Sequence, residues 1–187
     1  MQNNNSAMNG NVANSKKTFE LVLAALFGVL TFLGTYISIP MYPVPITLQT
    51  FFVLLCGFYL NPYYSALSMA LCLLLRFLTS GFSVFVTPSF GFLIAFIVAA
   101  SFVSSQRQKK HLAFGQVILL LVVAEVVLYL IGLPYMAYVL NVYLGKNLSF
   151  FTILKVGMLL FIPGDAIKLL VAAYIYRSLP ELKLLRK

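Results

Sequence analysis

The chain has few charged residues and few of the side chains that enzymes use for catalysis. Of its 187 residues, 9% are charged, and the sequence holds only 4 Asp or Glu, 1 His, 2 Cys and no Trp. Acid–base sites and metal centres need clusters of such residues. The sequence also has no HExxH pattern, no nucleophile elbow and no P-loop. We therefore expect a protein that is not an enzyme, holds no metal ion or cofactor, and hydrolyses no ATP by itself.

Polar residues that could cover a soluble surface are scarce as well. The chain is 61% hydrophobic and its mean hydropathy is +0.97. This composition cannot coat a soluble globule of this size, so we expect an integral membrane protein whose surroundings are the lipid bilayer. The net charge of +9 comes from Lys and Arg scattered over short flanks, without interleaved aromatic residues, so we expect no nucleic-acid partner.

The first 18 residues lack the apolar run and the small-residue cleavage site of a secretory signal. They are rich in Asn and Ser. We expect a disordered cytoplasmic tail over residues 1–18, followed by a single transmembrane domain over residues 19–187.

Apolar runs separated by turn signals predict an all-α membrane bundle with six transmembrane helices. Residues 21–39 carry no charge, and at ~1.5 Å per residue they span a hydrocarbon core of ~30 Å. Pro163 and Gly164 interrupt the last apolar run, which predicts a short extra helix before the sixth span. The expected helices cover residues 21–39, 46–60, 63–75, 88–105, 112–141 with an interruption near 132–134, 150–160, and 165–179.

Two connections between these helices have unusual compositions. Three prolines make residues 40–45 a stiff loop, and residues 79–92 are expected to form a long loop punctuated by glycine. Long ordered loops of this kind are often lids or binding loops.

Lys and Arg are distributed unevenly between the two ends of the expected spans, which predicts cytoplasmic N- and C-termini. Asp165, Lys168 and the two loops would then lie at the outer end. With this orientation the inside carries Lys16, Lys17, Arg107, Lys109, Lys110, Arg177, Lys183, Arg186 and Lys187, and the outside carries Lys146, Arg76 and Lys155.

Asp165 and Lys168 form the most unusual feature, because they place two charges within an apolar run. Each charge costs roughly 2.5–3.5 kcal/mol in hydrocarbon, so such residues usually face a partner, a cavity or a substrate. At positions i and i+3 they share a helix face. They form either an internal ion pair or a binding site for a ligand that has both hydrogen-bond donors and acceptors, and both alternatives stay open.

Other candidates also have two readings. Arg76 either reaches the membrane interface or points into a cavity and binds an anion. Glu125 lies near mid-bilayer, where we expect it to be hydrogen-bonded inside the bundle, with a gating role as the alternative. Ala24 and Gly28 stand four residues apart and allow another helix to approach closely, either from the same bundle or from a partner.

Three segments together resemble the BioY family, the biotin-specific S components of energy-coupling factor (ECF) transporters. They are Pro43-Val-Pro-Ile-Thr-Leu-Gln49, Gly57 and Phe161-Ile-Pro-Gly-Asp165-Ala-Ile-Lys168. The resemblance covers nearly the whole chain after the tail. It implies a six-helix S-component bundle in the bacterial inner (plasma) membrane, which captures biotin outside and delivers it inward with a T component and two ATPase subunits.

The resemblance also suggests roles for particular residues. Asp165 and Lys168 match substrate-site positions and would bind the ureido head or the carboxylate of biotin. Thr47 and Gln49 of the first segment join them as candidate substrate-binding residues. The face of Ala24 and Gly28 would meet the T component.

The chain departs from the family pattern between helices 3 and 4. The usual Gly-Leu-Pro-Val-Phe and Gly-Pro-Thr-Gly-Gly-Tyr runs are replaced by Gly81-Phe-Ser-Val-Phe85 and Thr87-Pro-Ser-Phe-Gly-Phe92, so a Tyr hydroxyl is missing at Phe92. Gly91, Phe92 and Arg76 remain candidate substrate-binding residues. The alternatives are an S component for another vitamin, and a small membrane enzyme or accessory subunit that uses Asp165.

Overall fold

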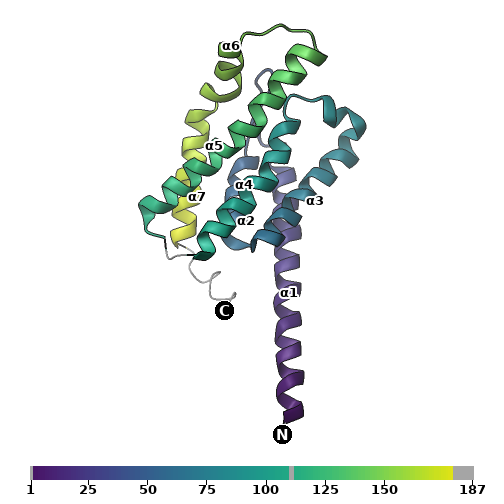
Figure 1. Ribbon diagram of the computed structural model, residues 1–187, viewed down its shortest axis with the longest axis vertical. Coiled ribbons are helices and arrows are strands. Elements are labelled where there is room, and N and C mark those ends of the chain that lie inside the picture. The colour runs from purple at the N-terminus through teal and green to yellow at the C-terminus, as the bar shows by residue number, and fades with distance from the viewer. Residues whose placement is uncertain (1, 110–111, 179–187) are drawn as a thin grey trace.

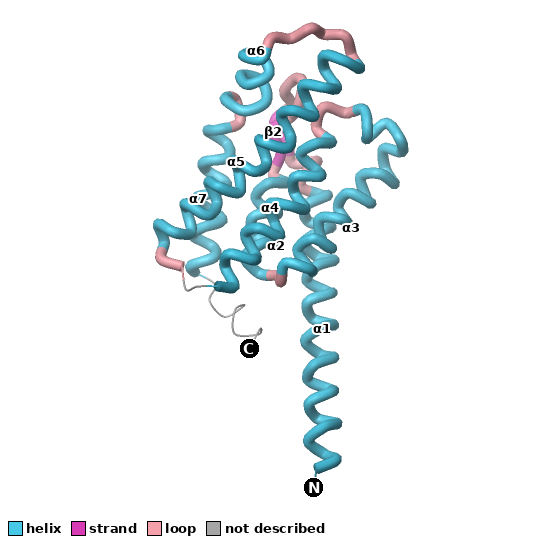
Figure 2. The backbone as a smooth tube through the Cα atoms, viewed as in Figure 1, coloured by secondary structure: helices cyan, strands magenta, loops and turns pink. Residues whose placement is uncertain are grey.

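The computed structural model describes residues 2–109 and 112–178, and almost all of them are helical (Figure 1). A two-stranded antiparallel hairpin pairs Ser38 with Thr47 and Ile39 with Ile46 (Figure 2). The elements are α1 (Gln2–Leu33), β1 (Ser38–Ile39), β2 (Ile46–Thr47), α2 (Gln49–Tyr59), α3 (Pro62–Ser80), α4 (Phe90–Lys109), α5 (Phe114–Tyr138), α6 (Phe150–Leu154) and α7 (Ile162–Ser178). A 3₁₀ turn (Gly81–Val86) and two π-helical turns (Val139–Tyr143 and Lys155–Leu159) connect some of them.

The short helix α2 lies in the interior of the bundle. It packs against α4, α1, α7 and α3, and Val53, Leu54 and Phe58 on it are fully buried. Its Gly57 allows a close approach to α4, because an added Cβ would lie 2.8 Å from the backbone oxygen of Ala100. A helix enclosed in this way needs only 11 residues, because other helices surround it.

The outer helices have the length and composition of membrane spans. Four helical segments of the described chain qualify: Pro62–Val86, Phe90–Arg107, Phe114–Tyr143 and Phe150–Ser178. Leu74, Leu130 and Leu170 are exposed large apolar side chains on these segments. Such an apolar exterior fits lipid better than water, as predicted for an integral membrane protein.

Several predicted boundaries at the N-terminal half are wrong. The first helix ends at Leu33 and not at 39, and the second begins at Gln49 and not at 46, because the intervening chain forms the hairpin. Gly34 makes this turn possible, since a Cβ there would lie 3.2 Å from the Gln49 nitrogen. The N-terminal segment also differs from the expected disordered tail, because α1 already begins at Gln2. No proline interrupts residues 2–18, so the helix can extend beyond the bundle.

The segments around the 79–92 connection and Pro134 differ from prediction as well. α3 continues to Ser80, and the 3₁₀ turn occupies much of the expected loop. α5 runs through Pro134 without the interruption expected near 132–134. Membrane helices tolerate Pro when neighbouring groups satisfy the backbone.

The division of the last apolar run agrees with the sequence. α6 and its π-helical turn precede α7, which begins at Ile162, three residues before the expected start. The hydroxyl of Ser149 accepts a hydrogen bond from the Thr152 amide at 3.3 Å and caps α6. The expected helix end at Leu179 lies outside the described residues, as do Lys110, Lys183, Arg186 and Lys187, whose side of the membrane was predicted.

Candidate ligand-binding site

A cavity of about 160 Å³ lies between the hairpin and helices α2, α3, α4, α5 and α7. Most of its wall is apolar. The polar side chains reach it from different elements, so the bundle has to be assembled before the site exists. The apolar lining consists of Val44, Pro45, Phe92, Leu93, Phe96, Leu128 and Phe161.

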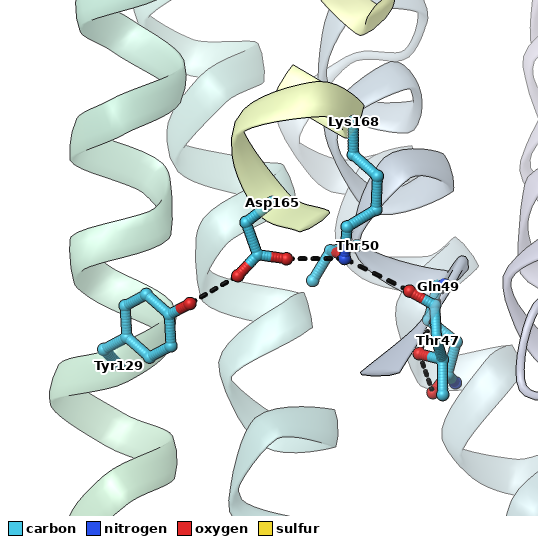
Figure 3. A network of polar contacts seen from close by, with 6 residues as sticks. All are labelled: Thr47, Gln49, Thr50, Tyr129, Asp165 and Lys168. Atoms are coloured by element: carbon cyan, nitrogen blue, oxygen red, sulfur yellow. Dashed lines mark hydrogen bonds and ion pairs between the residues drawn. The ribbon is translucent and has the colours of Figure 1, made fainter. Parts of the chain in front are cut away.

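Asp165 and Lys168 face each other at one side of the cavity. The Lys168 ammonium lies 2.5 Å from Oδ1 of Asp165, and the two residues are only 8% and 7% exposed. Lys168 also donates to the Thr50 hydroxyl at 2.5 Å and to the Thr47 carbonyl at 3.1 Å. The Tyr129 hydroxyl donates to Oδ2 of Asp165 (Figure 3). The internal ion pair is therefore present, and it ties α7 to β2, α2 and α5.

Thr47 and Gln49 line the cavity at the junction of β2 and α2, as expected for site residues. The Thr47 hydroxyl donates to Oε1 of Gln49 at 3.3 Å, and the backbone N–H of Gln49 donates to that hydroxyl oxygen at 3.4 Å. This exchange orients the two side chains at the start of α2, within the same network as Lys168.

Phe92 and Arg76 also reach the cavity. Phe92 packs edge-on against Tyr129, with ring centroids 6.4 Å apart. Arg76 lies on α3 four residues before its end, and its place in the cavity wall favours the anion-binding reading over the interfacial one.

Gly91, a predicted substrate-binding residue, is not among the residues that line the cavity. A Cβ on Gly91 would collide with the Tyr135 side chain and lie 3.3 Å from the Gly132 carbonyl. Gly91 thus lets α4 approach α5 closely, and Phe92 beside it is the residue that faces the cavity.

Ala24 and Gly28, whose contact with a T component stays a prediction, pack within this chain. Ala24 is 2% exposed, and a Cβ on Gly28 would lie 2.7 Å from the Ser68 carbonyl and 3.1 Å from the Leu71 side chain. These small residues therefore allow α1 to pack against α3 of the same chain.

Four polar residues that line the cavity were missed: Thr35, Thr50, Ser89 and Tyr129. Tyr129 lies four residues after Glu125, which places both on one face of α5. A Tyr hydroxyl in an apolar run usually needs a partner, and this rule could have indicated Tyr129. Thr50 gives no comparable signal, because its role depends on Lys168 from a distant helix.

Glu125 lines the cavity and is only 7% exposed. Its Oε1 has no hydrogen-bond partner within the described part of the chain, which contradicts the expected hydrogen bond inside the bundle.

Residues 2–109 and 112–178 contain no group of three or more His, Cys, Asp or Glu arranged to hold a metal ion. The site is thus suited to a small, largely apolar ligand with a few polar groups.

The sequence matches the model of the BioY family over residues 4–183. "Biotin transporter BioY" of Thermotoga maritima is 33% identical over 175 residues, covering 89% of this chain and 99% of the relative. Its counterpart in Rhizobium etli is 35% identical over 181 residues, covering 86% and 92%.

A crystal structure of the S-component for biotin from an ECF-type ABC transporter has a similar fold. The TM-score is 0.75 at 25% identity, with 90% of this chain and 94% of that chain covered. The predicted S-component bundle is therefore confirmed. With a family match that spans most of its length, this chain belongs to the BioY family.

Proposed function

We propose that this chain is the biotin-binding subunit of a membrane transporter and that biotin occupies the cavity lined by Asp165 and Lys168. The observation that carries the proposal is this charged pair in the wall of a largely apolar cavity that also contains other polar side chains, in a chain of the BioY family. The relatives named above are biotin transporters, and the similar solved structure is an S-component for biotin.

The chemistry of biotin is compatible with this cavity. Its fused rings and aliphatic chain suit the apolar wall, and its ureido group and carboxylate suit the charged and amide side chains. A cavity of about this size can take up one benzene-sized molecule. We therefore expect the lining to move when the complete ligand enters.

The expected orientation places the cavity toward the outside of the bacterial inner membrane. The hairpin and the 3₁₀ turn lie at the end of the bundle opposite the extension of α1 (Figure 1). The C-terminal ends of α4 and α7 lie toward the extension of α1 (Figure 1). These segments carry Lys16, Lys17, Arg107 and Arg177, which supports cytoplasmic termini. A T component and two ATPase subunits are the proposed partners, since the chain itself carries no ATPase motif.

A second candidate is transport of another vitamin. It is favoured by Arg76, which lines the cavity, and by Phe92, which lacks the Tyr hydroxyl of the usual family run. Both residues change the polarity of the wall and could alter ligand choice. Catalysis by Asp165 is not supported, because both of its carboxylate oxygens are engaged by Lys168 and Tyr129.

Equilibrium binding of radiolabelled biotin to the purified chain tests the proposal. We expect saturable binding with a Kd below about 1 μM, displaced by unlabelled biotin and not by other vitamins. Displacement by a different vitamin would favour the second candidate, and the lack of saturable binding in this range would contradict biotin transport. Uptake by cells with and without co-expressed T component and ATPases tests the partners.

A further inference from the structure

One carboxyl group in the cavity is left over after the ion pair is formed. Glu125 comes from the middle of α5, lines the cavity and is 93% buried, since its exposed fraction is 7%. Its Oε1 is shielded from solvent and lacks a hydrogen-bond partner among the described residues. Buried polar atoms without partners are rare, and each requires an explanation.

The two donors that meet Asp165 are already in use. Tyr129, one helical turn further along α5 from Glu125, donates its hydroxyl to Asp165. Lys168 forms an ion pair with Asp165 and donates to Thr50 and Thr47. Figure 3 shows how this chain of contacts runs from Tyr129 to Thr47. A ligand in the cavity can supply the donor that Oε1 of Glu125 lacks.

We infer that Glu125 is a ligand-binding residue whose carboxyl group accepts an N–H hydrogen bond from the polar head of the ligand. The inference rests on the proposed function, because the ureido group of biotin supplies two such N–H donors. A carboxyl oxygen accepts hydrogen bonds from N–H groups, so an acidic side chain at this position favours a cyclic urea or amide over a ring without N–H. Asp165 differs from Glu125, because its carboxylate is paired with Lys168 and accepts from the Tyr129 hydroxyl.

A double-mutant cycle between protein and ligand tests this role. We compare wild type and Glu125→Gln for binding of biotin and of two biotin analogues, each with one ureido N–H replaced by a ring oxygen. For wild type we expect one of the two analogues to bind about 10- to 100-fold more weakly than biotin. Gln is neutral and presents an NH₂ donor as well as an acceptor oxygen, so for Glu125→Gln we expect biotin itself to bind more weakly and the penalty for that analogue to shrink.

A matched control and a stability measurement separate binding from folding. Glu20 lies outside the cavity and accepts a hydrogen bond from the Asn61 side chain at 2.8 Å. Glu20→Gln makes the same chemical change there and should leave the affinity for biotin unchanged. Glu125→Gln should not lower the Tm of the ligand-free protein, because no hydrogen bond of Oε1 is lost. A fall in Tm together with unchanged discrimination between ligands would assign Glu125 a structural role and overturn the inference.

The remaining outcomes are also decisive. Suppose that wild type binds biotin, and that the affinity of each analogue relative to biotin falls by the same factor in wild type and in Glu125→Gln. The inference is then wrong, while biotin binding stands. If wild type does not bind biotin at all, the proposed function fails and this inference fails with it.

Discussion

Replacing Lys168 by Met should reduce both the stability of the fold and the affinity for biotin. The substitution keeps a long unbranched side chain but removes an ammonium that pairs with Asp165 at 2.5 Å and donates to Thr50 and Thr47. The Asp165 carboxylate then stays buried, with Tyr129 as its remaining partner in the network. Removing one member of a buried ion pair costs roughly 3–5 kcal/mol of folding free energy.

The double variant Asp165→Asn/Lys168→Met separates these two effects. Because it removes both charges, it should be more stable than Lys168→Met, since uncharged replacements of buried ion pairs often cost little. Its affinity for biotin should not recover, because neither charged partner is left for the ligand. Loss of such a partner costs ~2–5 kcal/mol of binding free energy, or roughly 30- to several thousand-fold in Kd.

The assays are thermal unfolding in detergent and equilibrium binding of radiolabelled biotin, both on purified protein. We expect the order of Tm to be wild type, double variant, Lys168→Met, while both variants bind biotin weakly. A double variant that binds biotin as tightly as wild type would refute the reasoning, because the pair would then serve only to hold the helices together.

Further predictions concern the cavity wall and the helix contacts. Arg76 lines the cavity, and its guanidinium would bind the carboxylate of biotin. Arg76→Gln should therefore weaken the binding of biotin by about 10-fold and leave the affinity for biotin methyl ester unchanged. Equal losses of affinity for both ligands would contradict this role. Gly57→Ala should lower the free energy of unfolding by about 1–3 kcal/mol, because its Cβ would press on Ala100 and Val103. Gly115→Ala is the control in thermal unfolding and should be neutral or stabilising, since nothing lies within 4 Å of the added Cβ; a loss as large as that of Gly57→Ala would contradict the packing argument.

The helical membrane architecture was predictable because lipid demands long apolar helices, and these are visible as runs in the sequence. A division of the last run close to Pro163 was predictable, since Pro removes a backbone donor, although the break falls at residues 160–161 and Pro163 lies in the first turn of α7. The end of α1 at Leu33 was not predictable, because the apolar run continues to Ile39 and the hairpin depends on contacts between Gly34 and Gln49.

The site was predictable where a residue type is costly in lipid. Asp165, Lys168 and Arg76 stand out as charges in apolar runs, and all three line the cavity. Small residues gave ambiguous signals, because Gly28 permits close helix contact whether the neighbouring helix belongs to the same chain or to another. Tyr129 and Asp165 are 36 residues apart in the sequence and lie on different helices, so only the assembled bundle reveals their contact.

Binding of biotin in the cavity can be measured directly because the natural chain contains no Trp. Phe161→Trp introduces one fluorophore into the cavity wall, and Phe151→Trp places the same fluorophore on a strongly exposed position nearby. Titration with biotin should change the Trp fluorescence of Phe161→Trp saturably, with a Kd below about 1 μM, and leave that of Phe151→Trp unchanged. If both variants bind radiolabelled biotin but the Trp at position 161 shows no response, biotin binds elsewhere and the central claim is wrong.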